Sequence, residues 1–145
     1  MITFEEYIDQ GIMRKGRIDL ERARSLIVSS ENKIKSLQEK IEKIGVRNDN
    51  ANDYVEYSYD TLMLIIRAML FSKGYSASGQ GSHEAEIAYL ATIGIEDGQV
   101  RFIDTLRYYR NGILYYGTHL DAEYANKVIA FTKKMYKHLR DLIKI

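Results

Sequence analysis

The sequence predicts an all-α fold, an antiparallel up-and-down bundle of about five to six helices. Three observations favour it. Apolar residues recur at helical spacing along most of the chain, no segment shows the period of two that marks a half-buried strand, and the sequence contains no proline. Because proline breaks helix interiors, its absence permits long helices. With 145 residues and no linker-like stretch, the chain is expected to form a single domain over residues 1–145.

The first two predicted helices have recognisable ends. Residues 3–14 predict a short helix that stops near Gly16. Residues 20–44 predict a long one, which Asp19 caps at its start and Gly45 ends. Its apolar positions recur in alternating steps of four and three, the spacing of a helix packed lengthwise against its neighbours.

The middle of the chain predicts the most buried helix. Residues 53–74 are apolar around most of the helix circumference, so we place this helix at the centre of the bundle. The Gly/Ser-rich stretch 75–82 predicts a loop that ends with Ser82 as an N-cap. Residues 83–94 then predict a short helix, whose early glutamates suit its positive end.

Two further helices complete the predicted bundle. Residues 99–116 predict the fifth, and Asp121 is expected to cap the last, over residues 122–145. Apolar residues gather on one side of this last helix, as a bundle member requires.

Composition excludes several classes of protein. A net charge of +1 argues against an extended surface for duplex nucleic acid, although residues 99–145 alone carry a net +5. The N-terminus lacks the pattern of a signal peptide, and no apolar run has the length of a membrane span. Without cysteine, and with His83, His119 and His138 lacking metal-ligand spacing, no metal site or cofactor is expected. We expect a cytoplasmic protein without membrane contact.

The segment Arg107–Gly117, RYYRNGILYYG, is the main functional candidate. On a helical wheel Arg110 lies in the middle of the apolar stripe, with Ile103 and Leu106 within about 60° of it. A guanidinium there must be paired, reach water, or face a cleft or a subunit interface. Pairing with a carboxylate such as Asp60 is one alternative.

The same segment places polar and small residues at regular intervals. Arg107, Asn111 and Tyr115 follow one another by single turns and share one edge of the helix. Gly112 and Gly117 weaken a helix interior, and a glycine there commonly admits another backbone or a ligand. The tyrosines alternatively belong to the core and to an interface.

The chain resembles the HEPN-domain family, small all-helical proteins encoded in prokaryotes beside minimal nucleotidyltransferases. Three stretches carry the resemblance: DLERARSLIVSSENKI, NDYVEYSYDTLMLIIRAMLFSKGYSASGQGSHEAEIAYL and LRYYRNGILYYG. Catalytic members carry an arginine, a polar residue, a few apolar positions and then a histidine. The resemblance implies a metal-independent ribonuclease site at a dimer interface, where the 2′-hydroxyl of RNA attacks in line.

Carried onto this chain, the resemblance assigns Arg110 to the family arginine and Asn111 to the polar residue. Tyr115 stands where the histidine is expected, and His119 lies nine residues after Arg110. Tyrosine, with an ordinary pKa of about 10, is a poor base at neutral pH. The resemblance and the pattern together give two sets of candidate residues. The expected catalytic residues are Arg110, Asn111, Tyr115 and His119. The expected substrate-binding residues are Arg107, Tyr116 and His83. An alternative for His83 is a role in capping a helix or anchoring a loop.

Two functions stay open. One is a HEPN protein of the toxin–antitoxin type, a homodimer that binds RNA or a nucleotide at the dimer-interface cleft and cleaves RNA without a metal. The alternative is a non-catalytic HEPN partner, or modification target, of a minimal nucleotidyltransferase. The intact Arg-Asn pair favours the first, and the missing histidine favours the second.

Overall fold

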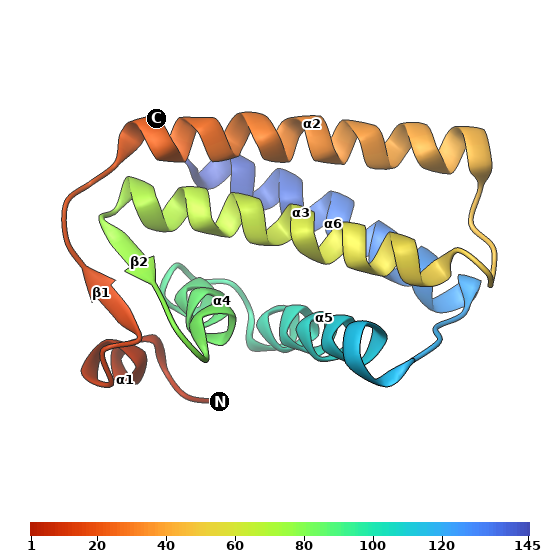
Figure 1. Cartoon of the computed structure of the whole chain (residues 1–145). Helices are drawn as coiled ribbons and strands as arrows, with labels where there is room; N and C mark the ends of the chain where they lie inside the picture. Colours follow the sequence, from red (N-terminus) through yellow and green to blue (C-terminus); the bar gives the residue numbers. More distant parts are fainter.

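The computed structural model describes residues 1–145 and contains six helices and two short strands (Figure 1). The protein is therefore mostly helical, as predicted. In chain order the elements are α1 (Phe4–Asp9), β1 (Met13–Lys15), α2 (Leu20–Ile44), α3 (Ala51–Ser72), β2 (Tyr75–Ala77), α4 (Ser82–Thr92), α5 (Asp97–Tyr116) and α6 (Ala122–Leu142).

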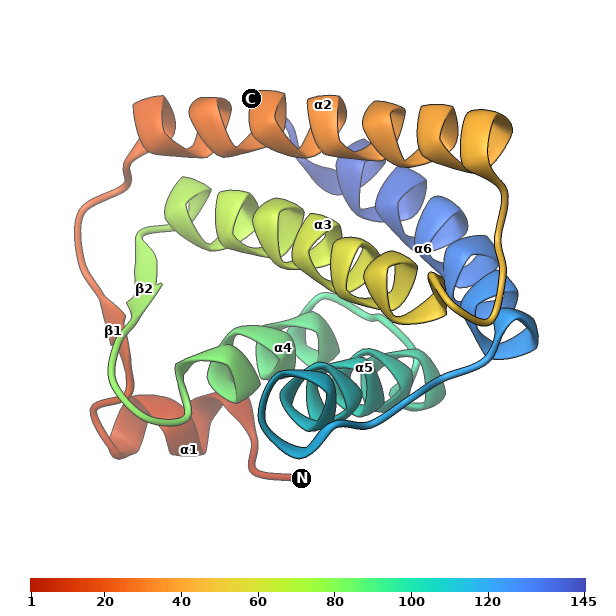
Figure 2. The same ribbon diagram turned by 45° about the vertical axis from the view of Figure 1, so that its right-hand side comes forward.

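The chain runs out along α2 and back along α3 (Figure 1). Helices α4 and α5 then run in opposite directions to each other, because the start of α4 lies beside the end of α5, and α6 returns in the same direction as α3 (Figures 1 and 2). Because α3 and α6 both run back, this neighbouring pair is parallel rather than antiparallel. The Asn52 amide fixes their adjacent starts: it donates to the carbonyl of Thr118 at 2.8 Å and accepts from the Leu120 N–H at 2.9 Å.

Helix α3 lies at the centre and packs against α2, α4, α5 and α6. Most of its side chains are buried, which agrees with the apolar residues on nearly all sides of this segment. The buried side chains form a single core cluster that also includes Leu37, Leu90, Ile103 and Leu139. This packing on every side makes α3 the element against which any site on α4 or α5 is positioned.

The prediction of no strands was wrong. Met13 pairs with Ala77, and Lys15 with Tyr75, in a two-stranded antiparallel sheet. Three residues per strand are too few to show a period of two, and the partners lie far apart in sequence. Gly74, at a φ of 86°, permits the close approach, because an added Cβ would lie 2.5 Å from the Gly16 carbonyl oxygen.

Several predicted helix ends also shift. The first helix stops at Asp9, and Met13, which was predicted to be helical, lies in β1 instead. The fourth begins at Ser82 itself, after Gly81 as N-cap, so the Ser82 side chain is not the cap. The prediction for residues 20–44, with Asp19 and Gly45 as caps, is confirmed, and Asp19 accepts from the N–H of Arg22 at 3.0 Å.

Candidate functional site

Helices α4 and α5 border a cleft of about 460 Å³ that contains four of the predicted site residues. Arg107, Asn111 and Tyr115 line it from α5, and His83 lines it from the first turn of α4. Gln80 and Glu84 complete its polar wall. Two segments some twenty-five residues apart in sequence therefore meet at one surface, as expected of a binding site.

Local structure explains why these side chains meet. On α5 the three residues follow one another at intervals of four, so their side chains lie along one edge of the helix. On α4 the chain enters through Gly79 and Gly81, whose φ values of 83° and 86° lie in the left-handed region that favours glycine. This turn brings His83 and Glu84 to the cleft at the start of the helix.

Arg107 is held by two carboxylates. Its Nε donates to Oδ1 of Asp104 at 2.8 Å, and its Nη1 lies 3.7 Å from Oε1 of Glu84. Burial opposes the charged guanidinium, but the hydrogen bond to Asp104 and the charges of both carboxylates outweigh it and raise the pKa of Arg107. The guanidinium is therefore charged and oriented, and its Nη groups keep N–H donors for a ligand.

His83 is exposed to solvent at the cleft, while the Nδ1 side of its ring faces the core. Its Nδ1 lies 3.5 Å from the hydroxyl oxygen of Tyr59, whose side chain is only 1% exposed, on α3. Burial, assisted by the positive charge of Arg67, lowers the pKa of His83, while Glu86 opposes the shift. Burial also raises the pKa of Tyr59 well above its ordinary value, so its hydroxyl stays protonated.

Arg110 lies behind the cleft rather than in its wall. Its Nε approaches Oδ1 of Asp60 at 3.0 Å, and its guanidinium carbon lies 5.7 Å from the centre of the Tyr59 ring. Nε of Arg110 and Oδ1 of Asp60 are close enough for an ion pair, but the angle between them is not that of a hydrogen bond. The buried Nε–H therefore has no hydrogen-bond partner. The structure thus shows the alternative in which Arg110 pairs with Asp60.

The glycines of the segment have roles within the chain. A Cβ at Gly112 would lie 2.5 Å from Oγ1 of Thr118, so this glycine admits the loop that follows α5. Gly117 is not in the helix interior; it is the C-cap, at a φ of 69°. The close approach expected at Gly112 is thus made by Thr118 of this chain, whereas nothing lies within 4 Å of a Cβ placed at Gly117.

The remaining predicted residues lie outside the cleft wall. Tyr116, 84% exposed, is the last residue of α5, and His119 is exposed in the loop before α6. Neither lines the cleft. Tyr115 lines it and is nevertheless 74% exposed, so most of its surface is accessible.

The sequence patterns did not indicate four members of the site: Gln80, Glu84, Asp104 and Tyr59. Of these, Asp104 alone had a local signal, its spacing of three residues before Arg107. Glu84 and Tyr59 reach the site only through the packing of α4 on α5 and α3, which no local pattern encodes.

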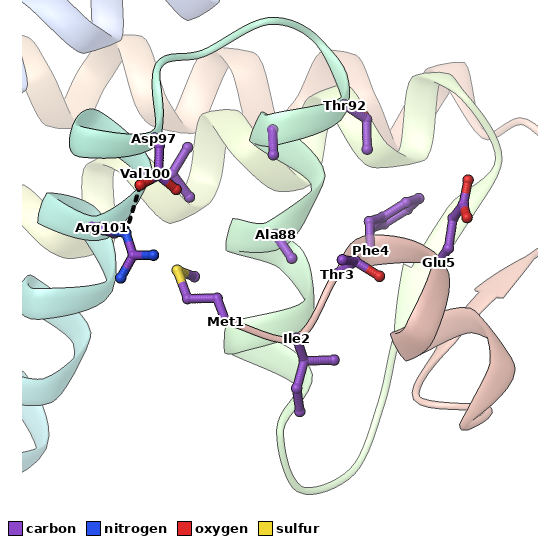
Figure 3. Close-up of a pocket in the computed structure, with 11 residues that line it drawn as sticks. Met1, Ile2, Thr3, Phe4, Glu5, Ala88, Thr92, Asp97, Val100 and Arg101 are labelled. Carbon is purple, nitrogen blue, oxygen red and sulfur yellow. Dashed lines mark hydrogen bonds and ion pairs between the residues drawn. The ribbon is translucent and has the colours of Figure 1, made fainter.

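A second cavity, of about 440 Å³, lies between the N-terminal segment, α4 and α5 (Figure 3). Phe4, Ala88 and Val100 form its apolar wall, and the Arg101–Asp97 ion pair borders it. No predicted site residue lines this cavity. No group of three or more His, Cys, Asp or Glu side chains is arranged to hold a metal ion, and none of the helices has the length and apolarity to cross a membrane.

Comparison with protein-family models, with curated proteins and with solved structures found no match to this chain. The resemblance to the HEPN family therefore stays a prediction that rests on the residues quoted above.

Proposed function

We propose that the protein binds single-stranded RNA at the α4–α5 cleft and cleaves it by in-line attack of a 2′-hydroxyl, as a HEPN-type protein of the toxin–antitoxin class. One observation carries the proposal. One edge of α5 carries Arg107, Asn111 and Tyr115. This edge and His83 of α4 line a single cleft of about 460 Å³. This volume lies in the range of small-molecule sites, which suits one nucleotide of a longer strand.

Each side chain offers a contact that RNA can use. The Nη donors of Arg107 suit a phosphate oxygen. Asn111 adds an amide that both donates and accepts, and the exposed ring of Tyr115 offers a surface for base stacking. Glu84 lies beside Arg107 and reduces the positive charge of the cleft. We therefore expect few phosphate contacts and a shallow dependence of affinity on salt.

A second function is favoured by the exposed aromatic end of α5. Tyr108 is 69% exposed and Leu114 48%, and Tyr115 and Tyr116 are more exposed still. Such a surface suits a protein partner. Under this alternative the chain is a non-catalytic partner, or a modification target, of a minimal nucleotidyltransferase. We assign the homodimer interface to the same exposed surface.

RNA affinity of matched variants tests the proposed function. Fluorescence anisotropy with a short labelled single-stranded RNA should show weaker binding for Arg107→Ala and Asn111→Ala than for wild type. Arg101→Ala is the control, because Arg101 is an exposed arginine of the same helix that pairs with Asp97 outside the cleft. Equal losses in all three variants, or no binding by wild type, would contradict the proposal.

Chelation tests the chemistry separately. The proposed reaction uses no metal ion, so cleavage should continue in EDTA and leave a cyclic phosphate and a free 5′-hydroxyl. Cleavage that EDTA abolishes would point to another mechanism. Two results together would favour the second function. The first is that RNA binds without being cleaved, and the second is that Tyr116→Ala weakens the binding of a nucleotidyltransferase.

A further inference from the structure

We propose that His83 takes the proton from the attacking 2′-hydroxyl in this cleft, and that the buried Tyr59 hydroxyl positions its imidazole ring. The inference rests on the proposed function, because it concerns the same cleft and the same RNA. It gives the site a proton acceptor that the sequence signature lacks, since Tyr115 stands where a histidine is expected.

The cleft itself limits the choice of acceptor. Four of the side chains that line it are ionisable, namely His83, Glu84, Arg107 and Tyr115. An arginine stays protonated and a tyrosine holds its proton at neutral pH, whereas the ordinary pKa of a histidine lies near 6.5. Glu84 lies beside Arg107 as the ion-pair partner of its guanidinium. His83 is thus the one lining group suited to proton transfer near neutrality.

Tyr59 determines how the imidazole ring lies. Its hydroxyl oxygen is 3.5 Å from Nδ1 of His83, at the long end of a hydrogen bond, and the two ring centres lie 6.4 Å apart. Tyr59 is fully packed in the core, and the Arg110 guanidinium lies over its ring. When Nδ1–H donates to the Tyr59 oxygen, the lone pair of Nε2, on the other side of the ring, is free for substrate.

The surrounding charges favour the neutral imidazole that a base requires. Burial lowers the pKa of His83, and three arginines add to this effect while one carboxylate opposes it: Arg67 on α3, Arg110 and Arg107 on α5, and Glu86 on α4. Arg67 and Glu86 themselves form an ion pair at 2.7 Å. The imidazole is therefore neutral at neutral pH before substrate arrives, and in the tautomer that donates from Nδ1 to Tyr59 the lone pair lies on Nε2.

The step conserves atoms and charge. Nε2 of His83 accepts the 2′-hydroxyl proton while the 2′-oxygen forms a bond to the adjacent phosphorus, and the bond from phosphorus to the 5′-oxygen breaks. The leaving 5′-oxygen takes a proton from water. The products are a 2′,3′-cyclic phosphate and a 5′-hydroxyl, and the imidazolium returns its proton to solvent.

Single-turnover cleavage of a short RNA across pH tests this role. His83→Gln should lower the cleavage rate by about 10²- to 10⁴-fold, as expected for a proton-transfer group, and should weaken binding of a 2′-O-methyl RNA far less than it lowers the rate. Added imidazole should restore part of the lost rate. His138→Gln is the matched control, because His138 is exposed on α6 far along the chain from the cleft, and should cleave like wild type.

Tyr59→Phe tests positioning, because it keeps the ring and removes the hydroxyl. It should lower the rate less than His83→Gln does and shift the acidic limb of the pH–rate profile. NMR of the ring nitrogens should show a changed Nδ1 signal. A purely structural role would alter melting temperature without moving the pH profile.

The outcomes separate the inference from the function on which it rests. If wild type does not bind RNA, the proposed function fails and the inference fails with it. If wild type binds and cleaves RNA but His83→Gln cleaves equally fast, or His119→Gln loses cleavage in its place, only the inference is overturned. Binding of RNA without cleavage at any pH likewise overturns the inference and leaves RNA binding intact.

Discussion

Nε of Arg110 lies 3.0 Å from Oδ1 of Asp60, and this contact ties α5 to the central helix behind the cleft. The two side chains are 26% and 38% exposed, so solvent only partly screens their attraction. The Tyr59 ring adds a cation–π contact to the same guanidinium. Arg110 thus supports the wall that carries Arg107 and Asn111.

Removing this support should destabilise the fold. Arg110→Ala is expected to lower the free energy of unfolding by about 1–2 kcal/mol, between the values for exposed and buried pairs. Urea denaturation measures it, and a double-mutant cycle with Asp60→Ala isolates the pair. An unchanged or higher stability would mean that Arg110 is held in place for a ligand instead.

Gly112 should not tolerate a methyl group. Although alanine favours a helix by about 1 kcal/mol, Gly112→Ala is expected to destabilise by about 1–2 kcal/mol, because its Cβ would lie 2.5 Å from Oγ1 of Thr118. Thr118→Ala in the same chain should recover part of the loss. Thermal unfolding measures both effects.

Gly98 provides the control on the same helix. A Cβ there meets no atom within 4 Å, so Gly98→Ala should be neutral or stabilise by up to about 1 kcal/mol. Equal effects of the two substitutions would show that Thr118 does not occupy the space beside Gly112.

His83 should make stability depend on pH. Burial and Arg67 lower its pKa in the folded protein below the unfolded value, so the unfolded chain binds more protons in the pH range between the two. Stability of wild type should therefore fall relative to His83→Gln as pH drops below about 6.5. Chemical denaturation at several pH values checks this, and parallel curves for the two proteins would contradict it.

Local patterns predicted the helices well, because the spacing of apolar residues within a helix shows which of its faces is buried. The segment Leu20–Ile44 has both caps in its sequence, and its ends were predicted to the residue. The strands were missed because the stabilising pairs, such as Met13 with Ala77, join distant segments. For the same reason the sequence placed Arg110 in the apolar stripe but did not distinguish a ligand from Asp60 as its partner.

The grouping of side chains at the α4–α5 cleft was predicted in part. Spacing alone showed that Arg107, Asn111 and Tyr115 share an edge, and the structure places all three at one cleft. It did not show that His83 lies opposite them, since that depends on how α4 packs against α5 and on the hydroxyl of Tyr59 in the core.

The exposed end of α5 should mediate self-association. We expect wild type to be a dimer by light scattering at tens of micromolar, and Leu114→Ser combined with Tyr116→Ser to shift it toward monomer, because both side chains are exposed apolar surface. Ile18→Ser is the control, since Ile18 is 56% exposed at a distant loop. A wild type that is monomeric at this concentration would contradict the prediction and leave the α4–α5 cleft, which one chain forms, unaffected.

RNA binding at the α4–α5 cleft is tested most directly by an NMR titration of the labelled protein with a short 2′-O-methyl RNA, which binds without being cleaved. We expect the backbone amide signals of residues 81–84 and 107–115 to shift together and saturate, while those of Ala88 and Val100 at the second cavity do not. Shifts confined to the second cavity, or none at millimolar RNA, would contradict it.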